Sequence, residues 1–190
     1  MAKRLRTQRR GSGGNQYRSP SHRHVDDVRL PAFNEGDGVV VDLIHAPGRT
    51  SPLAVIDYNG NEDYQIAAEG MMVGQKVVVG SGDAAPGNIM PLSKIPEGTP
   101  VHNIEGLPGD GGKYVKVAGS YGTVVSRGAV VVVQMPSGIN KEFNPNCRAA
   151  VGIIAGNGRQ DKPLAKAGKN YHALHTKAKA NFHTKGVAMN

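Results

Sequence analysis

Tryptophan is absent from this sequence, and its 190 residues include only three phenylalanines and six tyrosines. Few large rings are therefore available to fill one large aromatic core. Glycine (26) and proline (12) are frequent instead, which is typical of short strands joined by many turns. This length and composition predict one sizeable domain, or two small ones with extensions.

Cysteine is nearly absent as well, because Cys147 is the only one. A single thiol excludes an internal disulfide and a cysteine-based zinc site. Arg148, the next residue, could lower the pKa of this thiol and make it reactive. The apolar stretch CRAAVGII in which both residues stand favours a buried structural cysteine.

Long hydrophobic runs are also missing. The longest purely apolar run, 129–133, has the length of a strand and not that of a membrane span. The N-terminus carries basic residues without a hydrophobic region after them, which argues against a secretory signal. We therefore expect the protein inside the cell, in the cytoplasm.

Acidic residues are nearly absent from the two ends of the chain. Residues 1–24 hold seven basic residues and no acid, and residues 159–190 hold seven basic residues and one acid. The whole chain has a net charge of +8, so the ends carry +13 and residues 25–158 carry −5. Basic ends on a mildly acidic body predict a polyanionic partner reached by the ends, and a solvated disordered tail is the plainer alternative.

Short apolar stretches between turn signals predict strands throughout the body. Asn59-Gly60 fits the two-residue turn of a hairpin, in which both residues need positive φ. Arg127-Gly128 and Pro136 to Gly138 also resemble hairpin turns. The first group of predicted strands covers 38–46, 53–58, 62–68 and 76–80. The second group covers 99–105, 113–118, 121–127, 129–135, 139–143 and 147–154.

The glycine- and proline-rich stretch 81–91 separates these two groups and predicts a boundary between two small barrels. Residues 1–24 show no periodicity and are expected to be irregular. Only residues 173–183 have some helical propensity. The predicted layout is a basic N-terminal arm at 1–36, barrels at 37–82 and 83–156, and a basic C-terminal extension at 157–190.

The loop GLPGDGGKY, 106–114, is rich in glycine like a phosphate-binding loop. The nucleotide-binding pattern fails, because Leu107 stands where glycine is needed and Tyr114 where serine or threonine is needed. Its main-chain N–H groups and Lys113 could still contact an RNA phosphate, and a plain turn explains the sequence equally well.

Catalytic and metal-binding patterns are weak. His172 and His175 have an HxxH spacing, but His183 and Asp161 are the only further ligands nearby, so contacts with bases or phosphates are favoured over zinc. Carboxylate pairs such as Glu62 and Asp63 resemble solvated hairpin charges more than general acids. No nucleophile lies in an activating motif, and we find no base-flipping or cofactor site. We therefore expect neither enzymatic activity nor a cofactor nor a bound metal.

Two basic residues are isolated within the acidic barrels. Arg49 lies in the loop between the first two strands, where oligonucleotide-binding barrels hold their ligand, and Lys116 lies in an otherwise apolar stretch. Because the barrels are acidic, these residues are candidates for RNA contacts, although solvent exposure alone explains a basic residue in a loop. Stacking on bases is open for the tyrosines nearest basic residues, but packing is favoured for each. These are Tyr17, Tyr114, Tyr121 and Tyr171.

Longer motifs over the whole chain resemble the universal large-subunit ribosomal protein family number two, and the arm RSPSHRH is closest to its archaeal and eukaryotic branch. The motifs, in chain order, are APGNIMPLSKIPEGTPVHNIE, PGDGGKYVKVAGSYG, MPSG, CRAAVGII, AKAGKNYH and KGVAMN. The resemblance implies a mainly β fold, with an oligonucleotide-binding (OB) barrel followed by a Src-homology-3-like barrel and extended basic arms. It also implies a structural constituent of the large ribosomal subunit.

The resemblance further implies binding to large-subunit (23S-type) rRNA near the peptidyl transferase centre, and support of subunit assembly, subunit association and tRNA placement. Expected partners are rRNA, neighbouring ribosomal proteins and small-subunit components at the interface. Arg49 and Lys116 match the family's two principal RNA contacts. The second is usually arginine there, so Lys116 keeps the charge but lacks the planar fork. The sequence stops at Asn190, where the family continues into a His- and Gly-rich loop, so that loop's roles are not carried over.

The complete set of predicted RNA-binding residues combines these two positions with the basic, histidine and tyrosine residues of the ends and the glycine-rich loop. It comprises Arg49, Lys116, Arg4, Arg6, Arg9, Arg10, Tyr17, Arg18, His22, Arg23, His24, Lys113, Arg159, Lys166, Lys169, His172, His175, Lys177, Lys179, His183 and Lys185. A free-standing RNA-binding or translation-factor module with tandem barrels is the main alternative to a ribosomal role.

Overall fold

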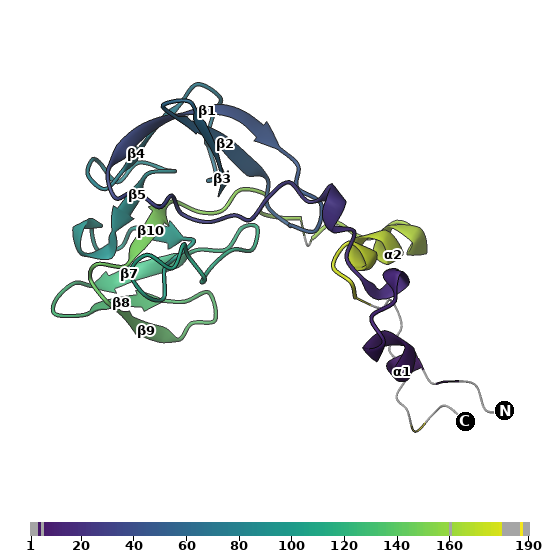
Figure 1. Cartoon of the computed structure of the whole chain (residues 1–190). Coiled ribbons are helices and arrows are strands. Elements are labelled where there is room, and N and C mark those ends of the chain that lie inside the picture. The colour runs from purple at the N-terminus through teal and green to yellow at the C-terminus, as the bar shows by residue number, and fades with distance from the viewer. Residues whose placement is uncertain (1–3, 5, 160, 180–186, 188–190) are drawn as a thin grey trace. The chain divides into compact units, whose positions relative to one another are not determined.

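The computed structural model describes residues 4, 6–159, 161–179 and 187, and it divides the chain into two compact units. The central unit is Asp26–Asp161, and the terminal unit combines Met1–Val25 with Lys162–Asn190. The described strands all belong to the central unit, where they form one ten-stranded sheet (Figure 1). The predicted mainly β class is therefore confirmed.

The described strands are β1 (Gly36–Ile44), β2 (Leu53–Tyr58), β3 (Asn61–Ile66), β4 (Lys76–Val79), β5 (Ile89–Pro91), β6 (Pro100–His102), β7 (Gly122–Ser126), β8 (Val131–Gln134), β9 (Asn140–Phe143) and β10 (Arg148–Val151). The described helices are α1 (Arg6–Gly11), α2 (Ala167–His175) and the 3-10 turns η1 (Asn15–Tyr17), η2 (Ser21–Arg23) and η3 (Leu92–Lys94).

The sheet has the strand order β3-β2-β1-β4-β5-β10-β6-β7-β8-β9. Its neighbouring strands pair antiparallel except β4 and β5, which meet in parallel through the single pair Val79 and Ile89. Two antiparallel halves thus join at one short parallel contact, with β1 to β4 in one half and β5 to β10 in the other (Figure 1). This arrangement fits an OB barrel followed by a Src-homology-3-like barrel.

The first hairpin forms as the sequence predicts. Asn59 has φ 55° and Gly60 has φ 89°, so both turn residues lie in the left-handed region that this turn requires. The Asp57 carboxylate accepts a hydrogen bond from the Gly60 N–H at 2.7 Å. Pairing from Tyr58 with Asn61 to Leu53 with Ile66 then keeps the register of β2 and β3 without a shift.

The predicted strand at 113–118 is wrong. Only Tyr114 pairs there, in an isolated bridge with Ile104. Gly111 and Gly112 precede it with φ 78° and 86°, and Val115 has φ 55°, so the chain turns repeatedly where a strand needs extended backbone. Tyr114 and Val115 instead pack, partly buried, against core clusters.

Three clusters of buried side chains form the core of the central unit. One packs β1, β2 and β4 around residues such as Ile56, and a second packs β6, β7, β8 and β10 around residues such as Val133. A third, smaller cluster combines Leu53 of β2 and Ile66 of β3 with Ile154, which follows β10. Full burial of one such aliphatic side chain contributes about 1.5–3 kcal/mol.

Cys147 is buried in the second of these clusters. Burial raises the pKa of its thiol, and the Asn144 backbone hydrogen bond offsets this only in part. The idea that Arg148 activates the thiol is therefore wrong, and the interpretation as a structural cysteine is confirmed.

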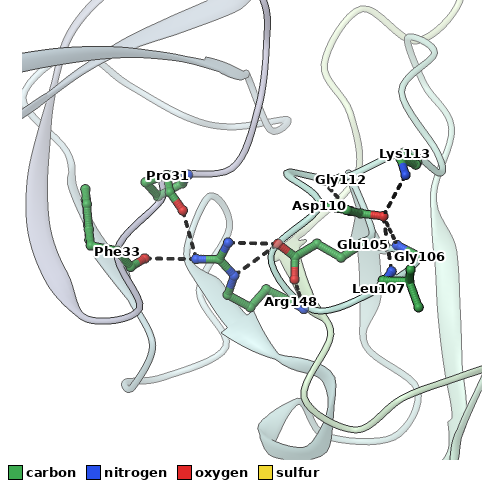
Figure 2. Close-up of polar contacts among 9 residues, drawn as sticks. All are labelled: Pro31, Phe33, Glu105, Gly106, Leu107, Asp110, Gly112, Lys113 and Arg148. Carbon is green, nitrogen blue, oxygen red and sulfur yellow. Dashed lines mark hydrogen bonds and ion pairs between the residues drawn. The ribbon is translucent and has the colours of Figure 1, made fainter.

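The Arg148 side chain forms a buried ion pair with Glu105 (Figure 2). The closest approach joins Arg148 Nη2 and Glu105 Oε1 at 2.8 Å, and the two side chains are only 7% and 0% exposed. Arg148 Nε and its backbone N–H also donate to this carboxylate. Arg148 Nη1 donates to the carbonyl oxygens of Pro31 and Phe33, both at 2.8 Å. The ion pair thus ties β10 to the chain that leads into β1.

The terminal unit has more regular structure than the sequence predicts. Helix α1 lies within residues 1–24, which were expected to be irregular, and two single 3-10 turns follow it. Helix α2 begins at Ala167 and not at the predicted 173, and residues 180–183 of that prediction lie outside the described residues. The Ser19 hydroxyl donates to the Thr176 carbonyl at 2.6 Å, which joins the N-terminal segment to the end of α2.

We predict that Glu105→Gln lowers the free energy of unfolding by about 3–5 kcal/mol, because it leaves the Arg148 charge buried without a counter-charge. Urea unfolding of the full chain measures this. The control is Asp27→Asn, which breaks the exposed Arg29–Asp27 pair and should cost about 0–1 kcal/mol. Equal losses for both variants would contradict a structural role of the buried pair.

Candidate nucleic-acid interface

Arg49 and Lys116, the two basic residues isolated in the sequence of the barrels, meet in one electrostatic environment. Arg49 ends a turn between β1 and β2, in which its N–H donates to the Ala46 carbonyl at 3.2 Å. Lys116 Nζ donates to the Val28 carbonyl at 3.3 Å. The Arg49 charge lowers the pKa of Lys116, so the fold brings together two residues that the sequence places far apart.

Burial lowers the pKa of both groups. For Lys116 the charges of Arg49 and Arg29 lower the pKa further, and Asp110 and Asp27 offset part of that effect. For Arg49 the Asp27 charge opposes the effect of burial. Within the described residues neither Arg49 nor Lys116 forms an ion pair. We call Arg29, Arg49 and Lys116 the basic cluster, which holds partly desolvated positive charge that an anion would stabilise.

The backbone beside Lys116 is strained. Val115 has φ 55°, which is an outlier for a β-branched residue. Its carbonyl accepts the Asn103 N–H at 2.8 Å, and its side chain packs against two of the core clusters, so the surroundings hold this conformation. Strain of this kind costs about 1–3 kcal/mol and gathers at functional sites.

The glycine-rich loop 106–114 is built around its own carboxylate (Figure 2). Asp110 accepts hydrogen bonds from the N–H groups of Gly106, Leu107 and Gly112 at 2.9, 3.1 and 3.0 Å. Burial raises the pKa of Asp110, but these bonds and the Lys113 ammonium outweigh it and hold the pKa below its usual range. The carboxylate thus fills the anion site that the loop's N–H groups make, which favours the turn interpretation over phosphate binding.

The Lys113 side chain remains accessible to solvent. Its Nζ lies 3.3 Å from Asp110 Oδ2, yet its side chain is 65% exposed. The Asp110 carboxylate therefore neutralises part of its charge without covering it.

The predicted RNA-binding residues of the ends lie in the terminal unit, apart from Arg159. Most of those described there are exposed, and Arg10, Tyr17 and His175 are half-buried. Tyr171 forms a ring stack with His175, with centroids 5.9 Å apart, so part of the predicted stacking surface is engaged within α2. Arg6 lies in α1, whereas His183 and Lys185 lie outside the described residues.

Metal ligation finds no support in the part of the chain that the structure describes. No three His, Cys, Asp or Glu side chains gather closely enough there to hold a metal ion. Likewise, no helix among the described residues is sufficiently long and apolar to cross a membrane.

Several important residues escaped the sequence reasoning. Arg29 precedes the first strand without a motif, and the Arg148–Glu105 pair joins two distant segments. Asp110 was visible as the only acid in the glycine-rich loop. An acidic residue among glycines indicates that its own carboxylate can accept the loop's N–H groups, which are then unavailable to a phosphate.

Comparison with known protein families shows a match over nearly the whole chain. Residues 2–79 match the family model "Ribosomal Proteins L2, RNA binding N-terminal domain", and residues 85–190 match "Ribosomal Proteins L2, C-terminal domain". The chain therefore belongs to the ribosomal protein L2 family.

Similar curated proteins come from archaea and bear the name "Large ribosomal subunit protein uL2". The protein from Methanothermobacter thermautotrophicus is 48% identical, over 100% of this chain and 83% of its own length. Those from Picrophilus torridus and Methanococcus vannielii are 47% and 45% identical over the whole chain, which covers 82% and 84% of their lengths. The predicted family and its archaeal character are confirmed.

We predict that Asp110→Asn destabilises the protein at neutral pH and that the difference from wild type shrinks in acid. The pKa of Asp110 is lowered in the folded state, so its contribution is present above the ordinary carboxyl value of 3.8 and is lost as pH falls through the lower folded value. Chemical denaturation of both proteins at pH 7 and in acid measures this.

The matched control is Asp83→Asn, at an exposed carboxylate. A loss of stability with Asp110→Asn that stays constant down to the lowest pH would contradict the role of the charge.

Proposed function

We propose that this protein is a structural constituent of the large ribosomal subunit and binds large-subunit (23S-type) rRNA through both of its units. The basic cluster is the observation that carries this proposal. Three positive charges gather on a unit whose sequence is acidic overall, and two of them are partly desolvated without an ion-pair partner among the described residues. RNA phosphates would supply the missing negative charge.

The two units have different tasks in this proposal. The terminal unit carries most of the positive charge and neutralises phosphates, which gives affinity without reading sequence. The central unit holds the basic cluster in place and fixes position and orientation on the RNA. The proposed domain layout keeps the arm at 1–36, barrels at 37–82 and 83–156, and the extension at 157–190.

We propose the location and task within the ribosome from membership of the L2 family. We place the protein near the peptidyl transferase centre, where it supports subunit assembly, subunit association and tRNA placement. Its partners are rRNA, neighbouring ribosomal proteins and small-subunit components at the interface. It acts in the cytoplasm as a binding and positioning protein and not as an enzyme, so the chemistry of the particle belongs to RNA.

We predict that Arg49→Ala and Lys116→Ala each weaken binding to large-subunit rRNA and each reduce the salt slope of the affinity by about 1, because each removes one phosphate contact. Filter binding at several salt concentrations measures both, and thermal unfolding checks that the fold is kept. Lys116→Arg should bind at least as tightly as wild type, because arginine adds a bidentate fork.

Lys76→Ala serves as the control, since it removes an exposed lysine of β4 outside the basic cluster. Losses with Lys76→Ala equal to those of the two cluster variants would mean that net charge alone sets the affinity.

We further predict a steep salt dependence for the whole chain. With about 8 phosphates neutralised, affinity should fall about a thousandfold or more between 50 and 200 mM salt. Proteolysis should trim both ends of the free protein quickly and leave them intact in large subunits. A flat salt response with protease-resistant ends in the free protein would favour a free-standing RNA-binding module.

A further inference from the structure

A cleft of about 620 Å³ opens in the central unit beside the basic cluster. Its walls come from Thr50, from residues 117–121 and Thr123, from residues 134–136 and Gly138 between β8 and β9, and from residues 156–159 and Asp161. This volume lies within the range of about 300–1,000 Å³ that is typical of small-molecule sites. The cleft is therefore large enough for one nucleotide.

One aromatic ring lines this cleft. Tyr121 is 46% exposed, and it takes part in none of the ring contacts found among the described residues. An exposed ring without a stacking partner beside an open cleft is the platform that unpaired bases use in RNA-binding proteins.

Glycines make up part of the remaining wall, at positions 119, 138, 156 and 158. Gly119 has φ +72°, and a Cβ there would lie 2.7 Å from Asn157 Oδ1. The glycine therefore lets the 117–121 segment approach Asn157 closely, so that both line the same cleft.

Two opposite charges stand at the same cleft. Arg159 and Asp161 both line it, both are exposed, and the described salt bridges do not include them. Guanine presents two acceptors, O6 and N7, that suit an arginine. Its N1–H and N2–H₂ groups are donors that suit a carboxylate. Adenine carries an N6 amino donor in place of O6 and has neither N1–H nor N2–H₂, and a phosphate would be repelled by Asp161.

The cleft is continuous with the basic cluster. Thr50 directly follows Arg49, Val117 directly follows Lys116, and both Thr50 and Val117 line the cleft. The Ala118 N–H donates to Thr50 Oγ1 at 3.1 Å, which joins the two segments. An RNA strand whose phosphates lie at the basic cluster would bring its next nucleotide to the cleft.

We propose that this cleft receives one unpaired guanine base of the bound RNA, stacked on Tyr121 and recognised by Arg159 and Asp161. This inference rests on the proposed rRNA binding and adds a base-reading site to phosphate contacts that carry no sequence information. The guanine gives the central unit a fixed register on the RNA.

The test uses the full chain, large-subunit rRNA and a glyoxal reagent that modifies N1 and N2 of unpaired guanines. Wild type should protect one unpaired guanine that becomes reactive with Tyr121→Ala and with Asp161→Asn. Tyr121→Ala should also bind rRNA about 5- to 100-fold more weakly, since a stacked base is lost. Tyr121→Phe keeps the ring and should restore both binding and protection.

The matched control is Val125→Ala, which truncates a side chain of equal exposure (46%) that does not line the cleft. It should leave affinity and the guanine pattern unchanged. Thermal unfolding of each variant separates a lost contact from a lost fold, and Tyr121→Phe and Asp161→Asn keep the inference testable should Tyr121→Ala unfold.

The outcomes distinguish this inference from the proposed function. If wild type binds rRNA with the expected salt dependence but Tyr121→Ala matches it in affinity and guanine reactivity, the base site is overturned and rRNA binding stands. If dimethyl sulfate footprinting shows that the protein protects an unpaired adenine and no unpaired guanine is protected, the assignment of the base as guanine is overturned. If wild type shows no salt-dependent rRNA binding, the proposed function fails, and the inference fails with it.

Discussion

The ion pair between Arg148 and Glu105 organises the central unit. Removal of two charges from water is costly, and such a pair persists only where further hydrogen bonds satisfy the remaining groups. Here Glu105 also accepts the Arg148 backbone N–H, and the guanidinium reaches the carbonyls of Pro31 and Phe33. One side chain therefore connects β10, the loop after β6 and the segment before β1.

The surface that carries the basic cluster depends on that connection. Glu105 leads directly into the loop held by Asp110, and that loop leads to Val115 and Lys116. The segment before β1 supplies Arg29 and the Val28 carbonyl that holds Lys116. The ion pair thus fixes both chains that carry two of the three members of the basic cluster. The third, Arg49, follows from the β1–β2 connection.

Local signals in the sequence predicted most of this architecture. Short apolar stretches and turn pairs such as Asn59-Gly60 are sufficient for hairpins, since the turn sets the register. The stretch 113–118 is similarly short and apolar, but its backbone follows the contacts of Asp110 and the packing of Val115, which are tertiary effects. The pairing of Arg148 with Glu105 is equally non-local. For the site, charge segregation predicted which residues were candidates, whereas their convergence and the cleft beside them required the fold.

The hydrogen bond from Ser19 to Thr176 has a consequence for biosynthesis. Ser19 leaves a translating ribosome early, and the carbonyl that it binds is added only when 176 residues have been joined. The N-terminal segment cannot make this bond until Thr176 has been added, although the strands of the central unit can pair in the meantime. During this interval its arginines are free of that constraint, so the basic N-terminal stretch takes its final shape only after the central unit has been synthesised.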